Sequence, residues 1–150
     1  MAIFKLLHIL SIVIWVGGMF FAYVVLRPSA AEMLQPPERL RLWDKVFKRF
    51  FKWVWLAVIL VLASGLVMIM LSGGMAVVPR FVHLMLLLGV VMMLLFGHVY
   101  FGCYRKLSRM VAAQDWQNAG AMLAKIRKLV AVNLGIGLLT IAVAILGRMA

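Results

Sequence analysis

This chain contains few acidic residues and a single cysteine. Only 4 of its 150 residues are Asp or Glu, against 16 Lys or Arg, and the formal net charge is +12. All four acids lie outside the long apolar stretches, which argues against carboxylate proton relays or acid–base hydrolysis inside a membrane. The lone Cys103 excludes an intrachain disulfide. No glycine-rich phosphate loop, Cys-x-x-Cys pair or His-Glu-x-x-His pattern is present.

Apolar residues dominate the chain. Hydrophobic residues make up 67% of the sequence, and only 13% of residues are charged. A soluble domain of this length cannot bury so much apolar surface, so the composition indicates an integral membrane protein. A membrane-spanning helix needs roughly 20 apolar residues, and the stretches that qualify are about 4–26, 53–72, 81–104 and 129–147. We therefore predict one all-α transmembrane domain over residues 1–150, folded as a four-helix bundle.

The positions of the positive charges orient the predicted helices. All but three Lys and Arg residues lie in two stretches, 27–52 and 105–128; the exceptions are Lys5, Arg80 and Arg148. By the positive-inside rule, we expect both stretches to be cytoplasmic loops with some amphipathic helix, and both termini to lie outside. The expected location is the bacterial inner membrane. Topology and contact with anionic lipid headgroups then account for the net charge, and no nucleic acid partner is expected.

A short motif recurs after half the chain length. His8 stands near the start of the first apolar stretch, three residues after Lys5, and His83 stands near the start of the third, three residues after Arg80. Each half therefore consists of a helix, a basic stretch and a second helix. This order predicts two parallel helical-hairpin repeats. The alternative is a chance similarity between two hydrophobic hairpins.

The two histidines are candidate metal ligands. They lie at matching depths in helices that run the same way, and an unpartnered imidazole in a dry interior is costly. Because imidazole is a normal axial ligand of haem iron, we expect His8 and His83 to hold haem b between the first and third helices, near the outer face. Lys5 and Arg80 would neutralise the haem propionates. The expected pocket lining is Trp15, Met19, Leu87 and Val90.

The same residues allow other interpretations. In one alternative, both histidines bind no metal and serve only as hydrogen-bonding groups at helix interfaces. His98 lies about 22 Å further along the third helix at 1.5 Å per residue, where it is either a ligand of a second site or a polar contact near the inner interface. The chain also holds 12 methionines. Their soft thioethers suit copper(I), although methionine is also a common filler of irregular gaps.

A haem with two histidine ligands has no open coordination position, which favours electron transfer over oxygen chemistry. We therefore predict a cytochrome b-like redox protein that exchanges electrons with a quinone or quinol, or with a redox partner in the cell envelope. If the chain is an enzyme, an oxidoreductase is the expected class. Copper handling is the alternative function, and a non-catalytic assembly role is the third. Because four short helices barely enclose a cofactor, a homodimer is expected.

The first predicted helix carries a more specific pattern. His8 is followed by Trp15, Gly17 and Gly18, and an Arg-Pro pair ends the stretch. This pattern resembles the CopD superfamily of small membrane proteins, which is named for bacterial copper resistance. It is also similar to the HemJ-type protoporphyrinogen oxidases, which are four-helix proteins of nearly this length that bind haem b. The resemblance implies four membrane helices with either copper handling or haem chemistry.

Two departures separate the chain from the HemJ-type pattern. The HemJ-type lysine, two residues after the histidine of the third helix, corresponds here to Met85. The Asn-Glu-x-Pro signature expected before the last helix is absent. The first helix therefore matches the CopD pattern better, and the resemblance to protoporphyrinogen oxidases keeps the helix order, the paired histidines and the Trp and Gly residues after His8.

Overall fold

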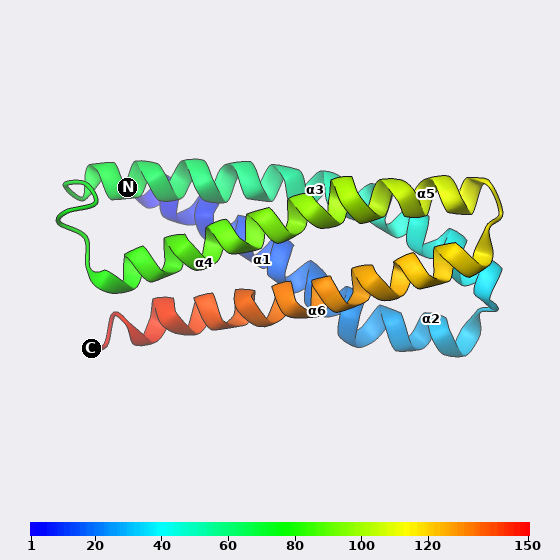
Figure 1. Ribbon diagram of the computed structural model, residues 1–150. Coiled ribbons are helices and arrows are strands. Elements are labelled where there is room, and N and C mark those ends of the chain that lie inside the picture. The colour runs from blue at the N-terminus through cyan, green and yellow to red at the C-terminus, as the bar shows by residue number, and fades with distance from the viewer.

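The computed structural model describes residues 1–150 and contains only helices and short turns. Four long helical stretches are apolar enough to cross a membrane, and they lie alongside one another in a bundle (Figure 1). The stretches are Ala2–Met33, Pro36–Leu71, Arg80–Ala112 and Trp116–Leu146. The predicted all-α, four-helix membrane bundle is therefore confirmed.

Two of the four stretches contain a π-helical segment. The first stretch comprises α1 (Ala2–Phe20), η1 (Phe21–Leu26) and α2 (Arg27–Met33). The third comprises α4 (Arg80–Gly97), η2 (His98–Tyr104) and α5 (Arg105–Ala112). The remaining two are single helices, α3 (Pro36–Leu71) and α6 (Trp116–Leu146). Because π-helical segments are rare and these two begin at nearly the same distance after His8 and His83, they support the predicted repeat.

The basic stretches 27–52 and 105–128 contain more helix than the amphipathic segments that the sequence predicts. Helix continues through most of both stretches and is interrupted only at residues 34–35 and 113–115. Apolar length alone predicts helix ends near the membrane boundary. It does not detect the amphipathic turns beyond that boundary, which continue the helix with one face packed on the bundle.

Local residue chemistry sets the helix ends. Pro36 begins α3, where its missing N–H and fixed φ suit the first helical turn. Asp115 caps α6, because its carboxylate accepts a hydrogen bond from the backbone N–H of Asn118. After α3 the chain turns at Gly73 and Gly74, whose φ values of +103° and +92° lie in the left-handed region that favours glycine.

The chain ends and the helix connections divide between the two ends of the bundle. Both termini and the turn at residues 72–79 lie at one end, which we call the termini end (Figure 1). The turns at 34–35 and 113–115 lie at the opposite end. We call this the basic end, because nearly all Lys and Arg residues lie in the segments that adjoin it. Both termini thus share one side of the bundle, and the assignment of the basic end to the cytoplasm stays a prediction.

The helices pair as two antiparallel hairpins. α1 packs along α3, and α4 packs along α6. Aromatic rings join the hairpins at the centre of the bundle: the Phe96 ring on α4 lies edge-on to Phe51 of α3, at a centroid distance of 5.4 Å, and to Trp15 of α1, at 6.3 Å. Such pairs contribute roughly 0.5–1.5 kcal/mol each beyond area burial. In lipid, where the hydrophobic effect does not drive helix association, van der Waals packing of this kind holds a bundle together.

Candidate functional site

His8 lies between the first two membrane helices. Its Nδ1 atom is 3.1 Å from the carbonyl oxygen of Val61 and 3.0 Å from Oγ of Ser64, both on α3. The missing side chain of Gly65 makes room for the ring, since a Cβ there would lie 3.2 Å from Cε1 of His8. A carbonyl oxygen only accepts, so Nδ1 carries the proton and donates. The lone pair of Nε2 is then free for a metal or a further donor.

His83 does not face His8. Its side chain is exposed, and its Nδ1 atom lies 3.3 Å from the carbonyl oxygen of Pro79, one turn back in its own helix. Leu87 and Val90, which share its side of α4, are 60% and 40% exposed. Within one copy of this chain the two imidazoles do not face each other, and the haem site expected between His8 and His83 stays a prediction.

The reason lies in which face of α4 turns inward. The buried residues of α4 are Met92 and Phe96, and these fall on the side away from His83. Both sides of this helix are apolar in sequence, so periodicity alone does not distinguish the lipid-facing side from the buried one. In a membrane protein, an apolar stripe on a helix faces either the lipid or the core of the bundle, and the sequence alone does not say which.

The structure separates the predicted site residues into three groups. Trp15 and Met19 are buried together at the bundle centre. His8 lies half-buried between α1 and α3. The exposed residues are Lys5, Arg80, His83, Leu87, Val90 and His98. Lys5 and Arg80 thus share the termini end without lining a common cavity, and His98 lies on the outside of η2.

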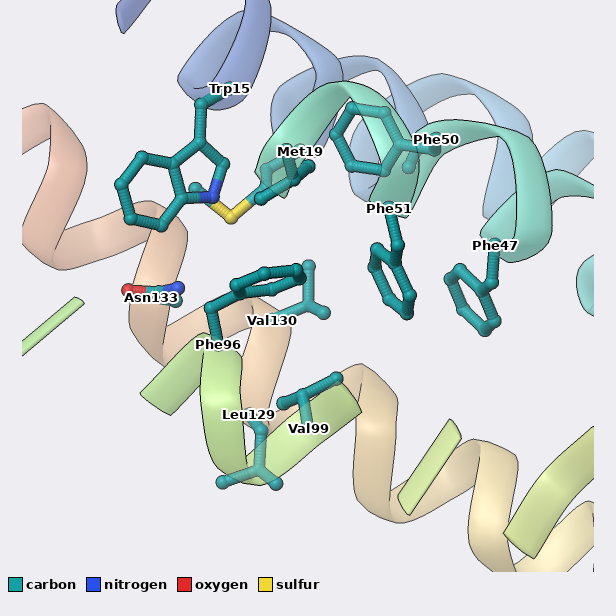
Figure 2. Close-up of a pocket in the computed structure, with 12 residues that line it drawn as sticks. Trp15, Met19, Phe47, Phe50, Phe51, Phe96, Val99, Leu129, Val130 and Asn133 are labelled. Atoms are coloured by element: carbon teal, nitrogen blue, oxygen red, sulfur yellow. The ribbon is translucent and has the colours of Figure 1, made fainter. Parts of the chain in front are cut away.

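A small cavity lies where Trp15 and Met19 meet the other helices. Figure 2 shows the side chains around it, which come from all four membrane stretches. The lining residues are Trp15, Met19, Ala22, Phe47, Phe50, Phe51, Val54, Phe96, Val99, Leu129, Val130 and Asn133. The cavity measures about 20 Å³, which is room for a single water or ion and not for a macrocycle.

Asn133 is the only polar side chain in that lining. It is 4% exposed, and its Nδ2 donates to the carbonyl oxygen of Met92 over 3.3 Å. Its Oδ1 atom is buried and has no hydrogen-bond partner. Sequence reasoning missed this residue, although a signal existed: Asn133 is the only asparagine within the four predicted apolar stretches. A polar side chain in a membrane helix is by default a candidate functional group.

The donors around this cavity are soft or neutral. The thioether of Met19 and the amide oxygen of Asn133 lie beside the indole of Trp15, and no carboxylate or imidazole joins them (Figure 2). Nowhere in the chain do three or more His, Cys, Asp or Glu side chains gather into a group that could hold a metal ion. Of these donors, the thioether suits a soft metal ion, whereas the amide oxygen is a hard donor that water or a hard cation would satisfy.

Comparison with known proteins identifies a family to which this chain is similar. A family model described as copper resistance protein D matches residues 44–146. The match runs from the first half of α3 to the end of α6 and covers more than half of the chain. No curated protein and no solved structure matches the sequence.

Proposed function

Because this chain belongs to the copper resistance protein D family, we propose that it is a multi-pass membrane protein that binds and handles copper. The ion is copper(I), the oxidation state that thioether sulfur prefers. The proposed binding position is the central cavity, with Met19 and Asn133 as ligands and Trp15 as an aromatic wall. An aromatic face attracts a nearby cation, most strongly where water is excluded.

The observation that carries this proposal is the buried thioether of Met19 in the lining of a cavity whose one polar side chain, Asn133, keeps a buried oxygen without a partner. Leaving a buried acceptor without a partner costs about 1–3 kcal/mol, so a chain that retains one gains when a cation or water fills the adjacent space. The cavity is large enough for one such group. Met19 lines the same cavity and adds the sulfur that favours copper over other cations.

His8 is a second, separate ligand position. It lies eleven residues before Met19 on α1, which corresponds to about 16 Å along the helix at 1.5 Å per residue. The free Nε2 atom suits copper, because imidazole is a common ligand of this metal. The two positions are too far apart to share one ion. His8 therefore acts nearer the termini end, where it receives or releases copper independently of the central site.

Copper(I) binding to the purified protein tests this function. The affinity is measured under anaerobic conditions by competition with a chromophoric copper(I) chelator. We expect Met19→Leu to weaken binding by about tenfold, the loss of roughly one soft ligand. Met33→Leu is the matched control, because Met33 is 81% exposed and lies outside the cavity. Equal affinity of the Met19→Leu variant and the wild type would overturn the central site.

Electron transfer by haem b is the second candidate function. The observation that favours it is the row of exposed residues along α4, which includes His83, Leu87 and Val90. This row would contact a haem only if two copies of the chain met there, so the function requires the homodimer expected from the sequence. A quinol or an envelope redox protein would supply the electrons. Protoporphyrinogen oxidation belongs to the same class of function.

The visible absorption spectrum distinguishes the two functions. A haem protein that uses His83 gives visible haem bands on reduction, and His83→Ala removes them while leaving copper(I) affinity unchanged. A colourless dimer or monomer that binds copper(I) rules out the haem function.

A further inference from the structure

A second and larger cavity lies toward the basic end of the bundle. It measures about 290 Å³, and its lining residues come from η1, α2, the first half of α3 and the first half of α6. Its lining residues are Ala22, Tyr23, Arg27, Ala31, Pro36, Arg39, Leu40, Trp43, Phe47, Trp116, Gly120, Leu123, Ala124, Ile126, Arg127 and Val130. The copper proposal makes no use of this space.

Three arginines line this cavity, and no acidic residue does. Each comes from a different element: Arg27 from α2, Arg39 from α3 and Arg127 from α6. The only hydrogen bond that their guanidinium groups make joins Nε of Arg27 to the backbone carbonyl oxygen of Tyr23. Three cations that line one cavity without a counter-charge repel one another, so an anion between them is favoured.

The nearest acidic side chain along α6 does not supply that anion. Asp115 precedes the helix, and its carboxylate is engaged by Asn118, whose Nδ2 donates to Oδ2 over 2.7 Å. Asp115 is absent from the cavity lining. Glu32, Glu38 and Asp44, which lie on α2 and α3, are absent from the lining as well, so the three guanidinium groups remain available for an outside ligand.

Aromatic and apolar side chains form the rest of the wall. The Arg27 guanidinium carbon lies 4.5 Å above the Tyr23 ring centroid, and the Arg41 guanidinium covers the Trp116 ring at 5.0 Å. Trp43 is buried beside them. Aromatic side chains with an apolar body and a polar edge are typical of the membrane–water boundary. The cavity therefore offers a basic rim and an apolar wall to one ligand.

The apolar part of the cavity lies toward the bundle centre. Ala22, Phe47 and Val130 line both this cavity and the central one, so the two spaces share a wall. Arg27 and Arg39 lie further toward the helix ends at residues 34–35, whereas Arg127 lies one helical turn from Val130 of the shared wall. The cavity therefore combines arginines with an apolar wall that continues to the bundle centre, which suits an amphiphile with an anionic head.

We propose that this cavity binds a phosphate-bearing ligand, whose phosphate is held by Arg27, Arg39 and Arg127. The planar guanidinium fork matches phosphate oxygens two at a time. Two sources supply this chemistry: an anionic phospholipid from the adjoining leaflet, or a free phosphate compound from solution. The proposal does not depend on copper binding.

The test compares two triple variants with the same change in net charge. The first replaces the cavity arginines: Arg27→Gln, Arg39→Gln and Arg127→Gln. The second replaces exposed cations of the same half that do not line the cavity: Lys48→Gln, Arg49→Gln and Arg109→Gln. Full-length protein in zwitterionic detergent is titrated with phosphatidylglycerol in one arm and with inorganic phosphate in the other. Binding is measured as protein–ligand complex in native mass spectrometry.

We expect wild type and the exposed-cation triple to bind one phosphatidylglycerol, and the cavity triple to bind it about tenfold more weakly or not at all. Competition by millimolar inorganic phosphate would identify a free phosphate compound as the ligand, and its absence would identify the lipid. Equal weakening of both triples, or no binding by wild type in either arm, would overturn the proposal. The single variant Arg39→Gln serves as a second measurement, with the same direction expected, if the cavity triple fails to fold.

Discussion

The two polar atoms of the Asn133 side chain differ, because one is hydrogen-bonded to Met92 and the other has no partner. Its Nδ2 donates to the carbonyl oxygen of Met92 over 3.3 Å, which joins α6 to α4 inside the bundle. Its Oδ1, on the same amide, is buried without a partner, and the residue lines the central cavity. The hydrogen bond holds the amide plane fixed, so the free oxygen is held in position for a ligand without further ordering of the side chain.

Replacing Asn133 separates a functional role from a structural one. Asn133→Leu removes an unsatisfied buried acceptor, so we expect an apparent melting temperature equal to or above that of the wild type. Copper(I) affinity should fall by about tenfold, because one ligand is lost. Both quantities are measured on one detergent-purified sample. A strongly destabilised variant would mean that Asn133 is present mainly for its structural hydrogen bond to Met92 and not as a copper ligand.

Asn133→Asp tests the same position in the opposite direction. A carboxylate in the dry cavity is costly when it has no partner, so the copper-free protein should melt at a lower temperature than the wild type. Copper(I) supplies the missing charge, so the metal should raise the melting temperature of this variant more than that of the wild type. An identical shift in both proteins would argue against a cation at this position.

The interface between α1 and α3 predicts opposite outcomes for two adjacent glycines. A Cβ at Gly18 would collide with the ring of Phe50, whereas a Cβ at Gly17 meets nothing within 4 Å. Gly18→Leu should therefore destabilise the protein by about 1–3 kcal/mol, the usual cost of overpacking. Gly17→Leu is the matched control and should be neutral. Thermal unfolding followed by size-exclusion fluorescence measures both, and Phe50→Ala should rescue the Gly18 variant.

His8 and His83 should differ in their effect on stability. His8 bonds to Ser64 across the helix interface, while His83 bonds only within its own helix. His8→Ala should lower stability, and a double-mutant cycle with Ser64→Ala should give a coupling near the membrane average of about 0.6 kcal/mol. His83→Ala should leave the stability of the monomer unchanged. A larger loss at His83 would indicate that a second copy of the chain covers it.

The membrane orientation is checked by labelling engineered cysteines. Cys103 is fully buried, so the wild type should react poorly with a membrane-impermeant maleimide. In a Cys103→Ser background, Met75→Cys should react on intact spheroplasts, because it lies in the turn at the termini end. Gln114→Cys should react only after permeabilisation, because the positive-inside rule places the basic end in the cytoplasm. The reverse pattern would invert the topology.

Composition and charge were sufficient to predict the fold, because a bilayer permits few solutions. A chain with four apolar stretches of membrane length must form helices, and the unequal distribution of basic residues orders them. The extent of the helices was harder to predict. Beyond the membrane boundary the helix depends on amphipathic packing, as in the segment around Arg39, and the apolar length says nothing about such turns.

The candidate site was only partly predictable. The sequence predicts that Trp15 and Met19 line a haem pocket near the outer face, whereas both line a central cavity of about 20 Å³, which is too small for a haem. Asn133 was missed, because a single amide forms no motif. The pairing of His8 with His83 assumed that both apolar stripes face inward, yet His83 is exposed. The resemblance to CopD proteins rested on the first helix, whereas the family model matches residues 44–146, so two separate parts of the chain lead to one family.

Phe47 lies between the central cavity and the larger cavity near the basic end. Its ring stacks on Phe51 at a centroid distance of 5.0 Å and borders both cavities together with Ala22 and Val130. Of these three side chains, the phenyl group of Phe47 is the largest part of the wall between the proposed copper position and the arginines. An ion released toward the basic end would meet three guanidinium groups, and a phosphate bound there would change that encounter from repulsion to attraction.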